Sequence, residues 1–114
     1  MMARRGRQKA PAVEYRSADG DVLALRASMT VGTRRQYQDA LGGSPLSQED
    51  AWHRAVEFLF ERLAVSWAVA GVDPITRQKE LLARFRMASQ DERRWIRDVL
   101  REHVAEYFPE LPPP

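Results

Sequence analysis

The longest apolar pattern in the chain is SQEDAWHRAVEFLFERLAVSWAVAG, residues 47–71. Its main stripe recurs at helical spacing and consists of Trp52, Ala55, Val56, Leu59, Leu63 and Trp67. A second apolar set, Phe58, Val65 and Val69, falls on the other side of the same helix. Ser47 and Asp50 resemble a capping box, and Gly71 ends the pattern. We therefore predict one long helix that is apolar on two sides, and such a helix lies at the centre of a fold or meets another chain.

Before this helix the pattern changes from helical to alternating. Val13 and Tyr15 alternate with charged residues, and Leu23 and Leu25 lie on one face of a return segment. The Asp19-Gly20 pair between them is typical of a turn, because glycine accepts a positive φ angle. We predict a two-stranded hairpin, which is marginal alone and must pack on the helices or be completed by a partner. Its edge offers backbone groups for strand addition.

Three further helices are predicted. A short helix over 31–41 follows the N-cap residue Thr30, a third helix begins at Asp73-Pro74, and the last helix begins at a capping box over 89–92 and runs to about Tyr107.

These elements predict the α+β class, mainly α, with an N-terminal β-hairpin followed by about four helices in a small single-domain bundle. We divide the chain into a flexible basic arm over 1–11, a single helical domain over 12–108 and a Pro-rich tail over 109–114.

Composition narrows the chemistry that the chain can carry. Its 114 residues include no cysteine and only two histidines, which argues against disulfides, thiolate chemistry and a compact metal site. We expect no metal and no cofactor. No run of 18 apolar residues is present, and the basic N-terminus lacks the apolar stretch of a secretory signal. We therefore expect a cytoplasmic protein that does not bind membranes.

The net charge of +2 is unevenly distributed. Arg4, Arg5, Arg7 and Lys9 lie in the first ten residues, and without them the chain has 14 basic and 16 acidic residues. A basic arm binds phosphates without sequence specificity, through counterion release. This arm gives the main alternative function, a small nucleic-acid-associated protein, although a solubilising end has the same composition.

Two charged rows run along the last predicted helix. They are Arg93, Arg97 and Arg101 on one side, and Asp98, Glu102 and Glu106 on the other. Arg94–Asp98 and Asp98–Arg101 are spaced for ion pairs. We predict a solvated, salt-bridged face rather than a surface that binds nucleic acid.

The titratable residues that could act in catalysis are not accompanied by a recognisable catalytic motif. His103 lies in the apolar face of the last helix without a serine, cysteine or metal-ligand motif, which favours a hydrogen-bonded core histidine. Glu57 and Glu61 are one turn apart, but Arg54 and Arg62 surround them, which favours surface charges. No phosphate-binding loop or nucleophile elbow is present. We predict that the protein is not an enzyme.

The order of four segments resembles the tail assembly chaperones of long-tailed bacteriophages and prophages. The segments are DGDVLALR (19–26), MTVGTRRQY (29–37), LAVSW (63–67) and GVDPIT (71–76). In that family a strand with an x-L-x-x-x-T-V-G continuation is often followed by V-x-W before a turn rich in Gly, Asp and Pro. The resemblance covers roughly residues 19–105.

The resemblance implies a non-enzymatic protein of the bacterial host cytoplasm that binds the tape measure protein and helps to recruit tail tube protein. A helix that is apolar on two sides can cover its own core and still offer a groove to an amphipathic helix. From the second apolar side we take Phe58, Val65, Trp67 and Val69 as partner-binding candidates. A head–tail connector or tail completion protein is the structural alternative, and a homo-oligomer is open.

Overall fold

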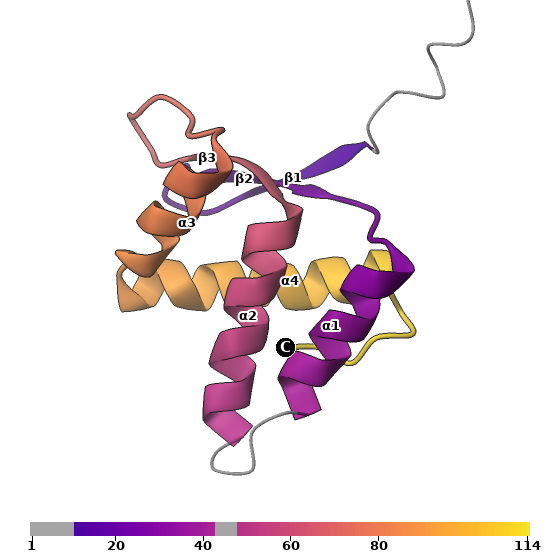
Figure 1. Ribbon diagram of the computed structural model, residues 1–114. Helices are drawn as coiled ribbons and strands as arrows, with labels where there is room; N and C mark the ends of the chain where they lie inside the picture. The colour runs from indigo at the N-terminus through magenta and orange to yellow at the C-terminus, as the bar shows by residue number, and fades with distance from the viewer. Residues whose placement is uncertain (1–10, 43–47) are drawn as a thin grey trace, which may run out of the picture.

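The fold combines one small sheet with helices that cover one of its faces and extend from it (Figure 1). The computed structural model describes residues 11–42 and 48–114. In these ranges the elements are β1 (Ala12–Arg16), β2 (Val22–Arg26), α1 (Val31–Gly42), α2 (Gln48–Leu63), β3 (Ala64–Ala68), α3 (Gln78–Arg86) and α4 (Gln90–Tyr107). The three strands form an antiparallel sheet in the order β1-β2-β3. The predicted class, α+β and mainly α, is confirmed.

The predicted hairpin forms, and its turn is closed by side-chain contacts. Gly20 has a φ angle of 91°, and the Ser17 hydroxyl accepts hydrogen bonds from the N–H groups of Asp19 and Asp21. The buried Asp21 carboxylate accepts a 2.9 Å hydrogen bond from the Ala70 N–H. The turn is thereby joined to the segment that follows β3.

The long helix predicted to run to residue 70 is wrong after Leu63, where the chain becomes β3. Val22 pairs with Ala68 and Leu23 pairs with Trp67, with an irregularity between Ala24 and Leu25. In the hairpin alone, one edge of β2 has unpaired backbone N–H and C=O groups. Pairing with 64–68 supplies partners for these groups, which favours a strand over a further helical turn in this segment. The completing strand that the hairpin needs thus comes from the same chain.

The predicted helix start at Asp73-Pro74 is also wrong, because α3 begins at Gln78. Proline disfavours the helical conformation of the residue before it. Ile75 and Trp67 exchange two backbone hydrogen bonds, of 3.0 and 2.9 Å, which hold Ile75 extended beside β3. The segment over 71–77 is therefore a connection that borders the sheet.

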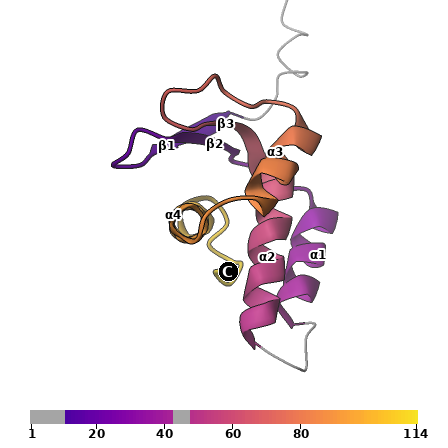
Figure 2. The same ribbon diagram turned by 90° about the vertical axis from the view of Figure 1, so that its left-hand side faces the viewer.

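Helix α4 passes beneath the sheet and supplies much of the core (Figure 2). The predicted capping box is confirmed, because Ser89 accepts from the Glu92 N–H at 3.1 Å and Glu92 accepts from the Ser89 N–H at 3.0 Å. The residues that α4 buries are Ile96, Val99, Leu100, His103 and Val104.

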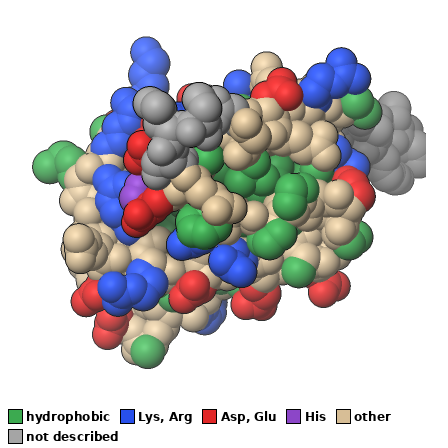
Figure 3. Space-filling model, turned by 90° about the horizontal axis from the view of Figure 1, so that it is seen from below, with side chains coloured by type: hydrophobic (Ala, Val, Ile, Leu, Met, Phe, Trp, Pro, Cys, Tyr) green, Lys and Arg blue, Asp and Glu red, His purple; other side chains and the backbone are tan. Residues whose placement is uncertain are grey.

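The chain after α4 turns back toward α1 and α2 (Figures 1 and 2). Phe108 and Leu111 are buried, and the Tyr37 hydroxyl of α1 donates a 2.6 Å hydrogen bond to the Pro112 carbonyl. Arg34 and Glu110 form a 2.6 Å ion pair. Seen from below, the molecule shows hydrophobic side chains gathered among charged ones (Figure 3). Residues 109–114 therefore pack on the helical body.

Candidate partner-binding site

The four partner-binding candidates do not lie on one surface. Because β3 replaces the last turns of the predicted helix, Val65 and Trp67 belong to the sheet and Val69 follows it. Phe58 alone remains on a helix, α2. The second apolar side of a single helix, from which these candidates were taken, does not exist.

Trp67 is a core residue, and its assignment as a partner contact is wrong. Its exposed fraction is 0%. The Phe60 ring meets it edge-on with 5.7 Å between centroids, and the Arg84 guanidinium lies 4.8 Å from the centre of the indole. A side chain enclosed in this way cannot reach a partner without unfolding of the surrounding core.

Val65 and Val69 are half-buried. Val69 lines a hollow of about 520 Å³ together with Trp95 and acidic residues, among them Asp19 and Asp91. This hollow lies between the β1–β2 turn and the start of α4, and the residues that line it do not include Phe58. Val69 and Phe58 therefore cannot be treated as one contact patch.

Phe58 is half-buried and borders a groove of about 440 Å³. Ala40 of α1 lines this groove together with Arg54, Glu57 and Glu61 of α2. The Arg62 guanidinium lies 5.0 Å from the centre of the Phe58 ring. The groove thus combines one accessible aromatic side chain with charges of both signs, and we call it the Phe58 groove.

The charges around the Phe58 groove are partly engaged. Glu57 accepts a 2.8 Å hydrogen bond from Arg86, and this bond raises the pKa of the Arg86 guanidinium. The backbone carbonyl of Glu61, as distinct from its carboxylate, accepts a 3.1 Å hydrogen bond from the Gln78 side chain. Glu57 is thus a partner in an ion pair between α2 and α3, in agreement with the prediction of a surface charge.

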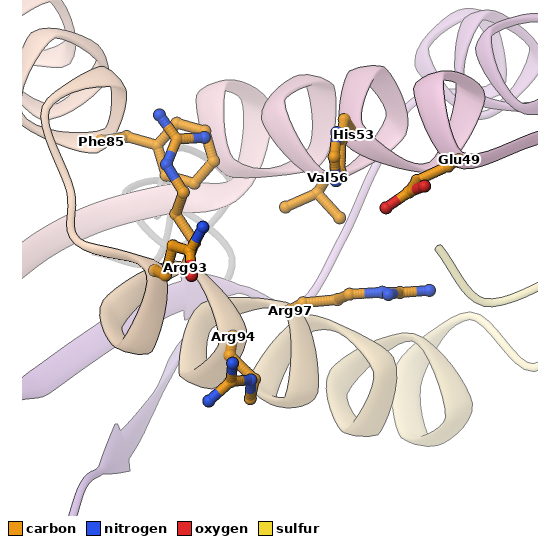
Figure 4. Close-up of a pocket in the computed structure, with 8 residues that line it drawn as sticks. Glu49, His53, Val56, Phe85, Arg93, Arg94 and Arg97 are labelled. Carbon is orange, nitrogen blue, oxygen red and sulfur yellow. The ribbon is translucent and has the colours of Figure 1, made fainter. Parts of the chain in front are cut away.

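A second groove, of about 400 Å³, lies between α2 and α4 (Figure 4). His53 and Arg93 line both this groove and the Phe58 groove. The Arg93 guanidinium lies over the Phe85 ring at 4.9 Å, and Arg97 extends along the groove toward the side of Glu49 (Figure 4). The floor residues Val56 and Phe85 are buried, so the accessible wall is mainly polar.

The prediction of a salt-bridged face on α4 is wrong for the arginine row, Arg93, Arg97 and Arg101. Arg93 donates to the carbonyls of Arg86 and Ala88 at 2.9 and 3.3 Å, which caps the end of α3. Arg97 lies 4.9 Å from the centre of the Trp52 ring and, with Arg101, approaches the Pro114 carbonyl at 3.4 Å.

Arg94 pairs with Asp91 at 3.2 Å, and neither predicted pair of Asp98 forms among the described residues. The arginines therefore hold α3 and the C-terminal segment in place, which sequence spacing on one helix cannot reveal.

His103 is a hydrogen-bonded core histidine, as predicted. Its Nε2 lies 2.7 Å from the Arg26 carbonyl and its Nδ1 lies 2.7 Å from the Tyr15 hydroxyl. A carbonyl only accepts, so Nε2 carries the proton and Nδ1 accepts from Tyr15. Burial lowers the pKa of His103 below its ordinary value. The imidazole therefore joins α4 to β1 and β2 in its neutral form.

This arrangement predicts a loss of stability in mild acid. Because burial lowers the pKa of His103 only in the folded state, the unfolded chain takes up the proton first as the pH falls below about 6.5. The stabilisation is complete above that pH and is lost as the pH falls, so the free energy of unfolding should be lower at pH 5 than at pH 7. Urea titrations at several pH values measure this slope.

Two glutamine variants test the assignment of the slope. His103→Gln should flatten the dependence, whereas His53→Gln, at an exposed residue of α2, should retain it. Equal slopes in the two variants would contradict the role given to His103.

Other sites receive no support within 11–42 and 48–114. No group of three or more His, Cys, Asp or Glu side chains there can hold a metal ion. None of the helices in these ranges has the length and apolar character needed to cross a bilayer. The nucleic-acid arm candidates Arg4, Arg5, Arg7 and Lys9, and the helix cap Ser47, lie outside the described residues.

Comparisons with protein-family models, curated proteins and solved structures found no match to this chain.

Proposed function

We propose that this chain is a non-enzymatic tail assembly chaperone of a long-tailed bacteriophage or prophage. In this proposal it binds the tape measure protein in the host cytoplasm and aids assembly of the tail tube. The four segments over 19–26, 29–37, 63–67 and 71–76 support the proposal through their resemblance to that family. The observation that carries it is the half-buried Phe58 beside its groove, because this aromatic ring lies at the rim of the core and not within it.

The Phe58 groove fits one side of an amphipathic helix. An apolar side chain of the partner would pack against Phe58, and its polar neighbours would meet Arg54 and Glu61 at the rim. A volume of about 440 Å³ receives a few side chains rather than a whole helix. Repeated contacts of this kind would cover the apolar stripe of a long helical protein before its partners assemble around it.

Co-expression with the tape measure protein of the same phage tests the proposal. Phe58→Asp should lower the amount of tape measure protein recovered with the tagged chain at least tenfold, because the charge must lose water in the contact. The matched control is Met87→Asp, at an apolar side chain with an exposed fraction of 82% at the end of α3, and its recovery should be unchanged. Circular dichroism of both variants checks the fold.

The outcomes separate the alternatives. Full recovery with a folded Phe58→Asp variant contradicts the proposal, and Phe58→Ala replaces it if the aspartate variant does not fold. A nucleic-acid-associated protein would instead lose its partners after nuclease treatment. A connector or tail completion protein would be present in mature particles, from which a chaperone should be absent.

A further inference from the structure

The outer edge of β1 is an open hydrogen-bonding surface. The Ser17 N–H donates to the Asp21 carbonyl, and the Ala27 N–H donates to the Pro11 carbonyl. The backbone N–H and C=O groups of the odd-numbered positions of β1 therefore point toward β2. The N–H and C=O groups of the even-numbered positions, 12, 14 and 16, therefore point away from the sheet. No described residue pairs with this edge, whereas Ile75 covers part of β3. Figure 2 shows β1 at the outer side of the sheet, with α4 beneath.

An acidic row runs along α4, the helix beneath this sheet. Asp98, Glu102 and Glu106 are exposed, one turn apart, and form no ion pair with any residue in 11–42 or 48–114. Burial, followed by the charges of Glu102 and Glu106, raises the pKa of Tyr15 on β1 to about 12. Tyr15 also lies 2.7 Å from Nδ1 of His103, which stands between Glu102 and Glu106 on α4, so these two glutamates lie near β1. Successive acids of the row are about 6 Å apart along the helix.

We propose that the outer edge of β1 binds residues 5–9 of a second copy of this chain as an added strand. Arg5, Arg7 and Lys9 are two residues apart, so in a strand they lie on one face, about 6.6–6.8 Å from one another. This spacing nearly equals that of the acidic row. The first ten residues contain no acid. The added strand gains backbone hydrogen bonds from β1 and charge pairs from α4.

The arm of the same molecule cannot pair with its own β1 and still keep Arg5, Arg7 and Lys9 on the face toward α4. Only Ala10 and Pro11 separate Lys9 from Ala12. A two-residue turn there would set Lys9 opposite Ala12, on the face away from α4, because opposite residues of antiparallel strands share a face. A longer turn would take Lys9 out of the strand. Direct pairing of two β1 edges is disfavoured as well, because it would bring two acidic rows together.

Sedimentation velocity of the nuclease-treated full chain at low salt tests the proposal. The wild-type chain should self-associate with rising concentration, and added salt should weaken the association. Two charge-reversed variants, Arg5→Glu/Arg7→Glu/Lys9→Glu and Glu102→Lys/Glu106→Lys, should each remain monomeric. An equimolar mixture of the two should associate again, because the unchanged basic arm of one variant meets the unchanged acidic row of the other, and the acidic arm meets the lysines introduced on α4.

Two further variants define the site. Asp39→Lys/Glu49→Lys changes the net charge by the same amount as the reversal on α4, but away from β1, and should associate like wild type. Glu14→Pro removes an outward N–H without removing a hydrogen bond to β2, and should prevent association. A wild-type chain that stays monomeric, a mixture that stays monomeric, or a Glu14→Pro variant that associates normally would each overturn the proposal.

Discussion

Replacing Trp67 with alanine should lower the free energy of unfolding by about 3–5 kcal/mol. The side chain has an exposed fraction of 0%, packs against Phe60 and Arg84, and belongs to the strand that completes the sheet. Its removal leaves a cavity that neighbours on a strand and two helices cannot fill without moving. Urea denaturation followed by circular dichroism measures the change.

Trp67→Phe is the matched control for this prediction. The indole N–H of Trp67 is buried without a hydrogen-bond partner among the described residues, so phenylalanine removes volume but breaks no hydrogen bond. Its effect should be clearly smaller than that of alanine. A loss below about 1 kcal/mol for Trp67→Ala, typical of a surface position, would contradict the place of β3 in the core.

Removing residues 109–114 should cost about 2–4 kcal/mol of stability, as judged from the apolar surface that it exposes. Leu111 leaves the core, where it belongs to the same cluster of buried residues as Tyr37. The 2.6 Å hydrogen bond from Tyr37 to Pro112 and the contacts of Arg97 and Arg101 with Pro114 are lost as well. Thermal and urea denaturation of the truncated chain measure the cost.

Two point variants locate this effect. Leu111→Ala should reproduce much of the loss, whereas Pro113→Ala, at an exposed residue of the same segment, should be close to neutral. A truncated chain as stable as the full one would show that residues 109–114 only rest on the surface.

Elements fixed by local signals were predictable from the sequence. The turn at Asp19-Gly20 needs a positive φ angle at Gly20, and the capping box at Ser89 and Glu92 uses side chains of one short segment. Helix α4 follows from the box and from the apolar spacing after it. Each of these signals involves residues that also contact one another in the fold.

The strand β3 was missed because its residues satisfy two patterns at once. Val65, Trp67 and Val69 continue the apolar stripes of α2, but they are also two residues apart, as in a strand. The choice is made by β2, which lies about 40 residues earlier and offers the backbone partners. Nothing within 64–68 carries that information.

Side-chain partners from distant segments were missed for the same reason. The arginine row of α4 meets Trp52, Phe85 and the C-terminal segment, whereas helix spacing suggested acidic partners on α4 itself. Of the four partner-binding candidates, Phe58 alone keeps its place on a helix beside a groove. The burial of Trp67 agrees with its place in the predicted apolar stripe, whereas its pairing with Leu23 depends on β2, far away in the sequence.

Photo-crosslinking from position 58 in phage-producing cells tests the proposed function most directly. A photoreactive phenylalanine analogue at Phe58 changes the ring little, and the same analogue at the exposed Met87 serves as the control. We expect irradiation to join the chain to the tape measure protein from position 58 and not from position 87. Equal crosslinking from both positions, or products from position 58 that contain nucleic acid or no tape measure protein, would contradict the proposed function.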